Sequence, residues 1–292
     1  MAKTKLHRLY DINGWAFVSV AVGLIALMTL YPIGQSLWLS LHAGRGVVTH
    51  FVGFGNVARL FHDPVFKQAL LNTLTFLVIQ VPIMILLSLA LSSCLNSPRL
   101  KFRSWFRLAI FLPCVTSLVA YSILFKSMFN LDGVINSFLL FLHIIDEPIP
   151  WLADPFWAKV TIIIAITWRW TGYNMIFYLS AMQNIDKSIY EAARVEGVSP
   201  IKQFFFITVP LLKPVILFTS ITSTIGTLQL FDEVMNITSG GPANSTLTLS
   251  LYIYNLSFKF MPNFGYAATV SYVIVVFSAL LALIQFKVAR DK

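Results

Sequence analysis

The chain alternates long apolar stretches with short polar ones. A helix needs roughly 20 apolar residues to cross the hydrocarbon core of a bilayer. Six stretches are long enough, namely residues 15–41, 69–95, 105–128, 158–183, 211–232 and 265–287. The pattern predicts an all-α, polytopic membrane protein with six transmembrane helices. They would form one membrane domain over residues 15–287, with an N-terminal tail (1–14) and a C-terminal tail (288–292) on either side.

The composition supports a membrane protein and argues against two other classes. Hydrophobic residues make up 57% of the 292 residues and charged residues only 11%, which is too apolar for a soluble protein. The net charge of +9 could suggest nucleic-acid binding. The basic residues are scattered between apolar stretches and form no patch, so nucleic acid is not an expected partner, whereas membrane lipid is.

The distribution of basic residues predicts the orientation. Most Lys and Arg residues lie in the N-terminal tail, the second-to-third connection, the segment around 187–213 and the C-terminal tail, for example Lys3, Arg99, Arg107, Arg194 and Lys292. Most acidic residues lie in the opposite loops. Cytoplasmic loops carry an excess of Lys and Arg. Both termini are therefore predicted to be cytoplasmic, in agreement with an even number of spans.

A polar insert at residues 186–210 interrupts the apolar pattern on the predicted cytoplasmic side. Ser188, with Glu191 three residues later, predicts a capping box at the start of a helix. Gly197 can end that helix, and Ser199 before Pro200 suits the start of another. The insert is therefore predicted to form two short helices with a bend at Gly197.

The surface formed by Ala192, Ala193 and Val195 on the first of these helices needs a partner, because the insert is too short to fold alone. Two readings are open. The helix packs on the chain's own spans, or it is offered to a groove in another protein.

The spacing of this insert is similar to a known family. Glu191-Ala192-Ala193, three residues, Gly197, nine residues and then Ile207-x-Val209-Pro210 resemble the EAA loop of membrane subunits in binding-protein-dependent ATP-binding cassette importers. The likeness continues in "VGFGN" (52–56), Asn72-Thr73, "FLP" (111–113), "FNLDGVIN" (129–136), Trp168 and "TSGGPANST" (238–246). The last stretch resembles the sugar-importing branch, in the type of the larger maltose and glycerol-phosphate permease subunit. Departures are small: Glu196 replaces the usual Asp, Val198 replaces Ala and Val209 replaces Leu.

The resemblance implies a permease subunit of the bacterial cytoplasmic (inner) membrane, which is a transport component and not an enzyme. Its expected partners are a second permease subunit in a heterodimer, two copies of an ATPase subunit, an extracytoplasmic solute-binding protein and a sugar. No cofactor is expected in this chain, because ATP and magnesium would bind the ATPase. The sequence agrees, since it holds no G-x-x-x-x-G-K-[ST] motif.

The resemblance also assigns roles in the insert. The EAA helix would sit in a cleft of the ATPase, whose closure would switch the permease between inward-open and outward-open. Glu191 would anchor it there, Ala192 and Ala193 would allow close approach, and Gly197 would supply the bend. Glu196 belongs to the same coupling set.

Candidate residues for the solute pathway lie in the fourth and fifth apolar stretches, because polar groups within spans often mark a pathway. The fourth stretch offers Arg169 and Tyr173 on one face, with Trp170 and Asn174 beside it. Aromatic rings stack on sugar faces, and amides bond hydroxyl groups. The alternative is a span anchored by Trp, with Arg169 snorkelling or paired to an acid. Because Arg169 could pair with an anion, the solute could also be anionic.

The fifth stretch places Thr219, Ser223, Gly226 and Thr227 on one face. Small hydroxyl residues also serve in ordinary packing between membrane helices, so both uses stay open. Asp232 and Glu233 close this stretch on the predicted external side. They could contact the binding protein or line an outer gate, but we expect them to be solvated.

The main alternative function is an ion-coupled secondary transporter of a small polar solute. Such a protein should show inverted repeats and a carboxylate at mid-membrane, and neither is evident here. Motifs of catalytic or metal-binding residues are also lacking, so no catalytic residue and no metal site are expected.

Overall fold

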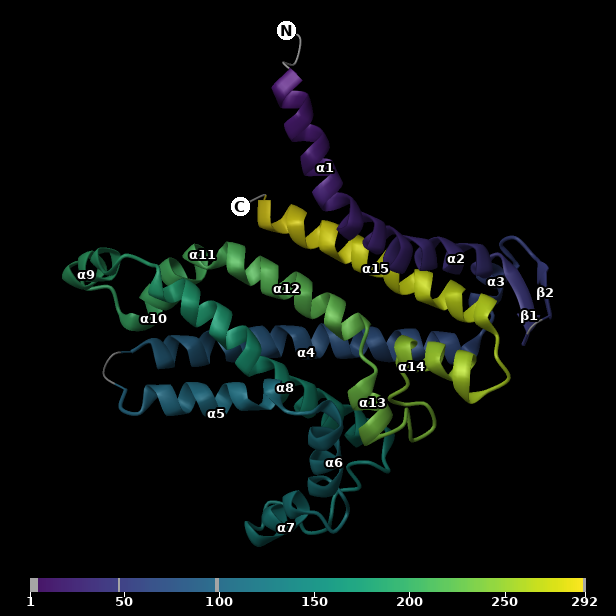
Figure 1. Cartoon of the computed structure of the whole chain (residues 1–292). Coiled ribbons are helices and arrows are strands. Elements are labelled where there is room, and N and C mark those ends of the chain that lie inside the picture. The colour runs from purple at the N-terminus through teal and green to yellow at the C-terminus, as the bar shows by residue number, and fades with distance from the viewer. Residues whose placement is uncertain (1–4, 47, 98–99, 291–292) are drawn as a thin grey trace. The chain divides into compact units, whose positions relative to one another are not determined.

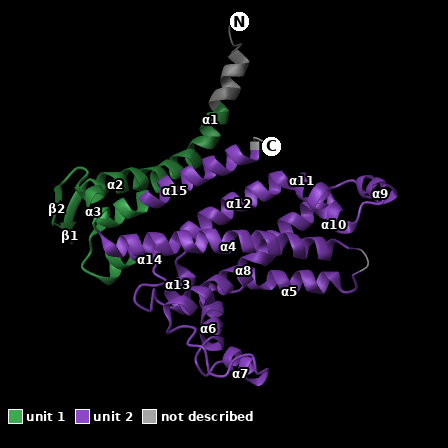
Figure 2. Ribbon diagram, turned by 180° about the vertical axis from the view of Figure 1, so that it is seen from behind, with its two compact units in different colours: residues 1–62, 254–272 green, residues 63–253, 273–292 purple. Residues whose placement is uncertain are grey.

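The computed structural model describes residues 5–46, 48–97 and 100–290, so the two predicted tails are only partly covered. Lys3, Arg99 and Lys292, which belong to the predicted cytoplasmic side, lie outside the described residues. The chain divides into two compact units, residues 1–62 with 254–272 and residues 63–253 with 273–292 (Figure 2). The described residues are mostly helical, as predicted, with one two-stranded sheet that was not predicted.

The first unit contains a long helical run that ends at a small hairpin. The run comprises α1 (Lys5–Ile25), a π-helical turn (Ala26–Leu30) and α2 (Tyr31–Ser40). Strands β1 (His42–Arg45) and β2 (Val48–Phe51) then pair antiparallel, with His42 opposite Phe51, and α3 (Gly55–Leu60) follows. The side-chain amide of Asn56 donates to the carbonyl oxygens of Ser40 (2.8 Å) and His42 (2.9 Å), which fixes α3 against the end of α2.

Helix α15 (Phe264–Arg290) begins in this unit with a close approach of two backbones. A Cβ atom on Gly265 would overlap the carbonyl oxygen of His42, so this position requires glycine. The hydroxyl groups of Thr269 and Tyr272 donate to the carbonyl oxygens of Ser40 (3.2 Å) and Ile33 (2.7 Å). These bonds join the start of α15 to α2.

The second unit is built around two long helices, α4 (Pro64–Asn96) and α8 (Pro155–Gln183), which pack against each other (Figure 1). Each begins with Asp-Pro. Asp63 and Asp154 accept hydrogen bonds from the N–H groups of the first helical turn, and the proline that follows occupies a position that needs no donor. The core beside them is apolar and includes Phe76, Met84, Ile162, Ile166 and Tyr178.

The span predicted over residues 105–128, in which Pro113 can kink or end the helix, is broken in the structure. The structure has α5 (Arg103–Val115) and α6 (Leu118–Met128), which are bent by 101° relative to each other. Thr116 between them has an extended backbone, and Ser117 is not helical either. Pro113 contributes to the break because it lacks an N–H for the helical ladder. Helix α7 (Val134–Phe141) follows.

The polar insert forms α9 (Lys187–Val195) and α10 (Pro200–Gln203), as predicted. A π-helical turn (Phe204–Thr208), α11 (Val209–Leu211) and α12 (Lys213–Leu228) come next. Helix α12 ends at Leu228, four residues before the predicted end at 232, and α13 (Asp232–Ile237) begins separately. Helix α14 (Leu249–Tyr254) and a π-helical turn (Asn255–Lys259) precede α15.

Three helical segments of the described chain are long and apolar enough to cross a membrane, namely Asn13–Ser40, Pro64–Asn96 and Phe264–Ala289. Two bent pairs, α5 with α6 and Pro200–Leu211 with α12, raise this to as many as five. Helix α8, predicted as the fourth span, is not among them, since its centre carries the polar segment "TWRWTGYN". Length and apolarity alone therefore do not reproduce six spans.

Candidate functional site

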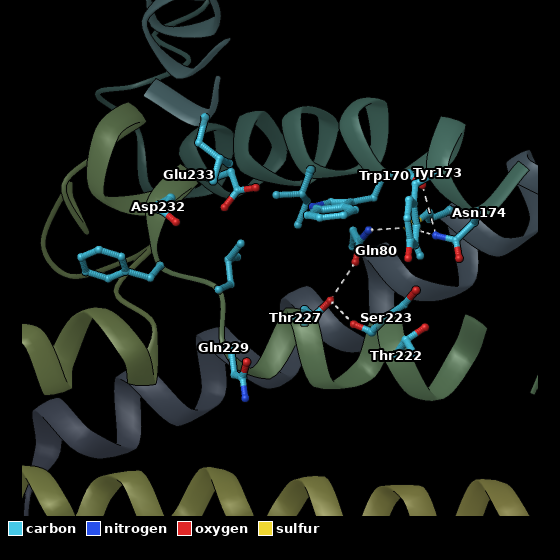
Figure 3. Close-up of a pocket in the computed structure, with 16 residues that line it drawn as sticks. Gln80, Trp170, Tyr173, Asn174, Thr222, Ser223, Thr227, Gln229, Asp232 and Glu233 are labelled. Atoms are coloured by element: carbon cyan, nitrogen blue, oxygen red, sulfur yellow. Dashed lines mark hydrogen bonds between the residues drawn. The ribbon is translucent and has the colours of Figure 1, made fainter. Parts of the chain in front are cut away.

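A cavity of about 350 Å³ opens in the second unit between α4, α8, α12 and the start of α13. This volume is in the range of small-molecule sites. Figure 3 shows side chains of α8 facing those of α12, with a glutamine of α4 between them. The polar and aromatic lining residues are Gln80, Trp170, Tyr173, Asn174, Thr222, Ser223, Thr227, Gln229, Asp232 and Glu233. Among the described residues, no Lys or Arg lines this cavity.

Asn174 offers an unused acceptor in this cavity. Its amide nitrogen donates to the carbonyl oxygen of Trp170 (3.1 Å) and contacts the sulfur of Met84 (3.3 Å). Its Oδ1 atom is buried and has no hydrogen-bond partner. A buried polar atom without a partner is costly, so a ligand hydroxyl that donates to Oδ1 would be favoured.

Gln80 and Thr227 join two helices at the cavity wall. The Thr227 hydroxyl donates to Gln80 Oε1 at 3.1 Å and to the carbonyl oxygen of Ser223 at 2.9 Å. Gln80 Nε2 contacts the sulfur of Met84 at 3.2 Å. The bond between Thr227 and Gln80 therefore connects α12 to α4 directly beside the cavity.

Two aromatic side chains form the α8 side of the cavity. The rings of Trp170 and Tyr173 are 5.8 Å apart and nearly perpendicular, at 89°. Each is 36% exposed, so both rings have accessible surface. Such a pair presents apolar ring surface next to amides and hydroxyl groups, which suits a sugar with one apolar face and several hydroxyls.

The structure divides the predicted pathway residues into two sets. Six of them line the cavity, namely Trp170, Tyr173, Asn174, Ser223, Gly226 and Thr227. Thr219 does not, because it is fully buried and its hydroxyl bonds Tyr178 Oη at 2.6 Å. It serves packing between α12 and α8, which is the alternative that the sequence left open.

Arg169 does not line the cavity either. It is only 5% exposed, and its Nη2 atom donates to the carbonyl oxygens of Cys114 (3.3 Å) and Thr116 (3.1 Å) at the break between α5 and α6. Its guanidinium carbon lies 5.0 Å from the centre of the Tyr121 ring. Arg169 thus neither snorkels nor faces a solute, and it holds a neighbouring piece of backbone.

Glu233 corrects the expectation of a solvated acid. Asp232 is exposed, but Glu233 is only 4% exposed and lines the same cavity as Trp170. The nearby Arg169 acts on its carboxyl group electrostatically. Sequence reasoning also missed Gln80 and Gln229. Gln80 was detectable, because an amide inside an apolar helix is costly unless it has a partner.

The start of α9 differs from the predicted capping box. Its N-cap is Asp186, whose carboxylate accepts a hydrogen bond from the Ser188 N–H at 2.9 Å. This bond favours the ionised form and lowers the pKa of Asp186 below its usual value. Asp186 therefore stabilises the start of α9 above its unfolded pKa, and the benefit is lost as pH falls through the folded pKa.

The end of α9 and the start of α10 follow the prediction. Gly197 has a φ of +74°, a left-handed conformation that side chains with a Cβ adopt rarely. The Ser199 hydroxyl accepts from the Lys202 N–H, and Pro200 occupies the first turn of α10. The bend at Gly197 between two short helices is confirmed.

The predicted coupling residues are mostly available at the surface. Glu191, Ala192, Glu196 and Gly197 are exposed, whereas Ala193 is 7% exposed and packs within the chain. Val195 is 89% exposed. The apolar surface of α9 is therefore only partly covered by the chain's own helices.

Comparison with known proteins gives a consistent family. Residues 101–290 match the model of a family described as "Binding-protein-dependent transport system inner membrane component". The chain is similar to the lactose transport system permease protein LacF of Rhizobium radiobacter, with 66% identity over 100% of this chain and 98% of that protein. It is also similar to the arabinooligosaccharides transport system permease protein AraP of Halalkalibacterium halodurans, with 30% identity over 89% and 82% of the two chains.

Solved structures agree at the level of the fold. A bacterial ABC transporter involved in the import of the acidic polysaccharide alginate has a chain that superposes with a TM-score of 0.84. The superposition covers 97% of this chain and 96% of that one, at 21% sequence identity. A second structure contains the alginate transporter in complex with an alginate pentasaccharide-bound periplasmic protein, also with a TM-score of 0.84.

Proposed function

The chain belongs to the family of binding-protein-dependent transport system inner membrane components, and we propose that its own cavity lines the path of a neutral sugar across the membrane. As a sugar-importing permease of the ATP-binding cassette type, it is a transport subunit and not an enzyme. The cavity between α4, α8 and α12 carries the proposal, because it combines two aromatic rings, amides, hydroxyls and the free acceptor of Asn174.

The charge around this cavity favours a neutral sugar over an anionic one. Asp232 and Glu233 line one end, and no described Lys or Arg lines the cavity. Arg169, which the sequence offered as an anion partner, is bonded to backbone carbonyls instead. A lactose-like disaccharide is our choice of substrate, since the relative with 66% identity is named for lactose transport.

We propose six spans with both termini in the cytoplasm. Helices α1 with α2, α4, α8 and α15 would each cross once, and the bent pairs would supply the other two. Helix α8 is not apolar enough to be recognised as a span by itself, which is expected of a span whose polar face lines a pathway within a protein interior. With this topology, the loop from 186 to 210 faces the cytoplasm.

We further propose that this loop couples the chain to an ATPase. Glu191, Ala192 and Glu196 are exposed on and just after α9, and the neighbouring Val195 is almost fully exposed. A short helix with uncovered apolar surface suits a groove in a partner. Ala193 would contribute by packing α9 onto its own chain and not by touching the partner, since it is buried.

The assembly that we propose contains a second permease subunit, two ATPase subunits and an extracytoplasmic solute-binding protein. ATP and magnesium would be bound by the ATPase subunits. The alternative of an ion-coupled secondary transporter receives no support from the family to which the chain belongs.

The experiment that tests the pathway is ATP-driven uptake of labelled lactose by the complete transporter in proteoliposomes. We expect Asn174→Ala to reduce uptake about fivefold, the equivalent of one hydrogen bond of about 1 kcal/mol. Asn184→Ala is the matched control, because Asn184 is an exposed asparagine at the end of the same helix. Equal uptake by Asn174→Ala and wild type would exclude this cavity as the pathway.

A further inference from the structure

A second cavity in the same unit, of about 800 Å³, has a different chemical character. It lies where α4 and α8 end and where α5 and α9 begin, on the side of the unit that carries the 186–210 loop. It is separate from the cavity of Figure 3, because the two share no lining residue. None of the roles proposed so far uses it.

Four cationic side chains line this cavity, and they come from two helices. Arg103 and Arg107 lie on α5, and Lys187 and Arg194 lie on α9. Among the described residues, no Asp or Glu lines it. The acid next to Lys187 in the sequence, Asp186, is exposed and caps α9. The cavity therefore holds positive charge that its own lining does not neutralise.

Arg107 shows this lack of neutralisation most directly. Its Nη2 atom donates to the carbonyl oxygen of Leu95 at 2.9 Å, near the C-terminus of α4. Its Nε atom is buried and has no hydrogen-bond partner. A guanidinium with an unsatisfied buried N–H is a costly arrangement unless an acceptor is supplied. An external anion would supply that acceptor.

Three neutral polar side chains of the cavity already have hydrogen-bond partners within the chain. Tyr190 Oη bonds the Thr208 hydroxyl at 2.9 Å, and Gln203 Nε2 donates to the carbonyl oxygen of Val198 at 2.7 Å. These bonds hold α9 against the segment that follows it. The cationic groups are the charged part of the lining that is available to bind a ligand.

We propose that this cavity binds the phosphate group of an anion, either a phospholipid headgroup or free phosphate. Arginine forks match phosphate oxygens geometrically, and basic pockets between transmembrane helices on the cytoplasmic side suit anionic headgroups. The membrane-boundary location rests on the proposed topology, whereas the charge and the free Nε atom of Arg107 do not. A bound phosphate would link α5 to α9 and so stabilise the base of the 186–210 loop.

The first test uses the purified full-length chain in a neutral detergent, with three probes: phosphatidylglycerol, phosphatidylcholine and inorganic phosphate. Native mass spectrometry counts retained lipid, and thermal unfolding reports stabilisation by each probe. We expect phosphatidylglycerol to be retained and to raise the Tm, while phosphatidylcholine does neither. If inorganic phosphate also raises the Tm and displaces phosphatidylglycerol, free phosphate is a ligand; if it does neither, the ligand is the lipid headgroup.

The second test identifies the cavity. We expect Lys187→Gln with Arg194→Gln to weaken phosphatidylglycerol binding by about fivefold per cation removed. Both side chains are exposed on α9, so we expect this double variant to fold. It is therefore a safer test than Arg107→Gln, which would remove a hydrogen bond at the end of α4. Lys202→Gln is the matched control, because Lys202 is an exposed cation of the same loop that does not line the cavity. The proposal is overturned if no phosphate-bearing probe binds, if both lipids bind equally, or if the double variant binds as tightly as Lys202→Gln.

Discussion

Arg169 Nη2 donates a hydrogen bond to the carbonyl oxygen of Thr116 at 3.1 Å, from the middle of α8 to the break between α5 and α6. The break frees backbone carbonyls from the helical ladder, and a buried carbonyl needs a donor. The second bond of the same nitrogen, to Cys114, meets the same need. Arg169 is therefore a positioning residue that fixes the 101° bend of a pair of helices.

We expect Arg169→Met to destabilise the chain by roughly 3 kcal/mol, because the carbonyls lose their donor and Glu233 loses its nearby positive charge. Thermal unfolding of the purified chain in detergent measures the loss. Lactose uptake should fall with it, since α6 packs against α13, whose first residues line the pathway cavity.

Lys126→Met is the control for this variant, since Lys126 is an exposed cation near the end of α6. Its stability should change by no more than about 0.5 kcal/mol. If Arg169→Met unfolds at the same temperature as Lys126→Met, the role of Arg169 at the break is refuted.

Two glycines in the predicted pathway helices should respond in opposite ways to added side chains. A Cβ on Gly172 would overlap the carbonyl oxygen of Ile110, where α5 crosses α8, whereas a Cβ on Gly226 meets nothing within 4 Å. We expect Gly172→Ala to destabilise the chain by roughly 1–3 kcal/mol through overpacking. Gly226→Ala should leave stability unchanged or raise it by up to about 1 kcal/mol, because alanine favours the helix.

The same pair separates packing from the pathway. Gly226→Leu would project into the cavity, so it should lower lactose uptake while the Tm stays near that of the wild type. Gly172 does not line the cavity, and its alanine variant should lose uptake only as far as it loses stability. Measuring Tm and uptake for each variant shows whether it acts through packing or through the pathway. A Gly226→Leu transporter with full uptake would argue against passage beside α12.

The helices and the insert could be predicted from the sequence because their signals are local. Apolar length gave the positions of α4, α8 and α15, and Gly197 with Ser199-Pro200 gave the bend and restart of the loop. The sequence marked Pro113 as a residue that can kink or end its helix, but it could not single out the sharp break after Val115, because Pro82 lies inside the unbroken helix α4.

The remaining features could not be predicted, because they depend on hydrogen bonds between residues that lie far apart in the sequence. Asn72 was noticed only as part of a family motif, yet its amide donates to the carbonyl oxygens of Asn244 (2.8 Å) and Leu247 (3.0 Å). Asn136 is a second such residue, and its side-chain oxygen accepts a hydrogen bond from the Trp151 indole N–H at 2.8 Å. Helical spacing put Arg169 and Tyr173 on one face, but Arg169 bonds the break between α5 and α6, whereas Tyr173 lines the cavity. No local pattern contains that information.

Gly197 offers the sharpest test of the proposed coupling. Its φ of +74° suits glycine and is tolerated by asparagine, whereas a β-branched residue is strained there by roughly 1–2 kcal/mol. Nothing lies within 4 Å of a Cβ at this position. Within the chain, the effect of a substitution therefore depends on backbone conformation and not on space for the side chain. We expect Gly197→Asn to keep ATP-driven uptake and Gly197→Val to lose most of it.

Assembly of the complex and sugar binding by the external protein should be unchanged in both variants, which is checked by co-purification and by titration with lactose. Glu191→Lys, which leaves the bend intact, should lose uptake through its charge alone, because Glu191 is exposed on the helix that we propose binds the ATPase. Loss of uptake in Gly197→Asn as well as Gly197→Val would mean that the partner needs the bare glycine surface. Full uptake in Gly197→Val would mean that the bend does not transmit the motion of the ATPase.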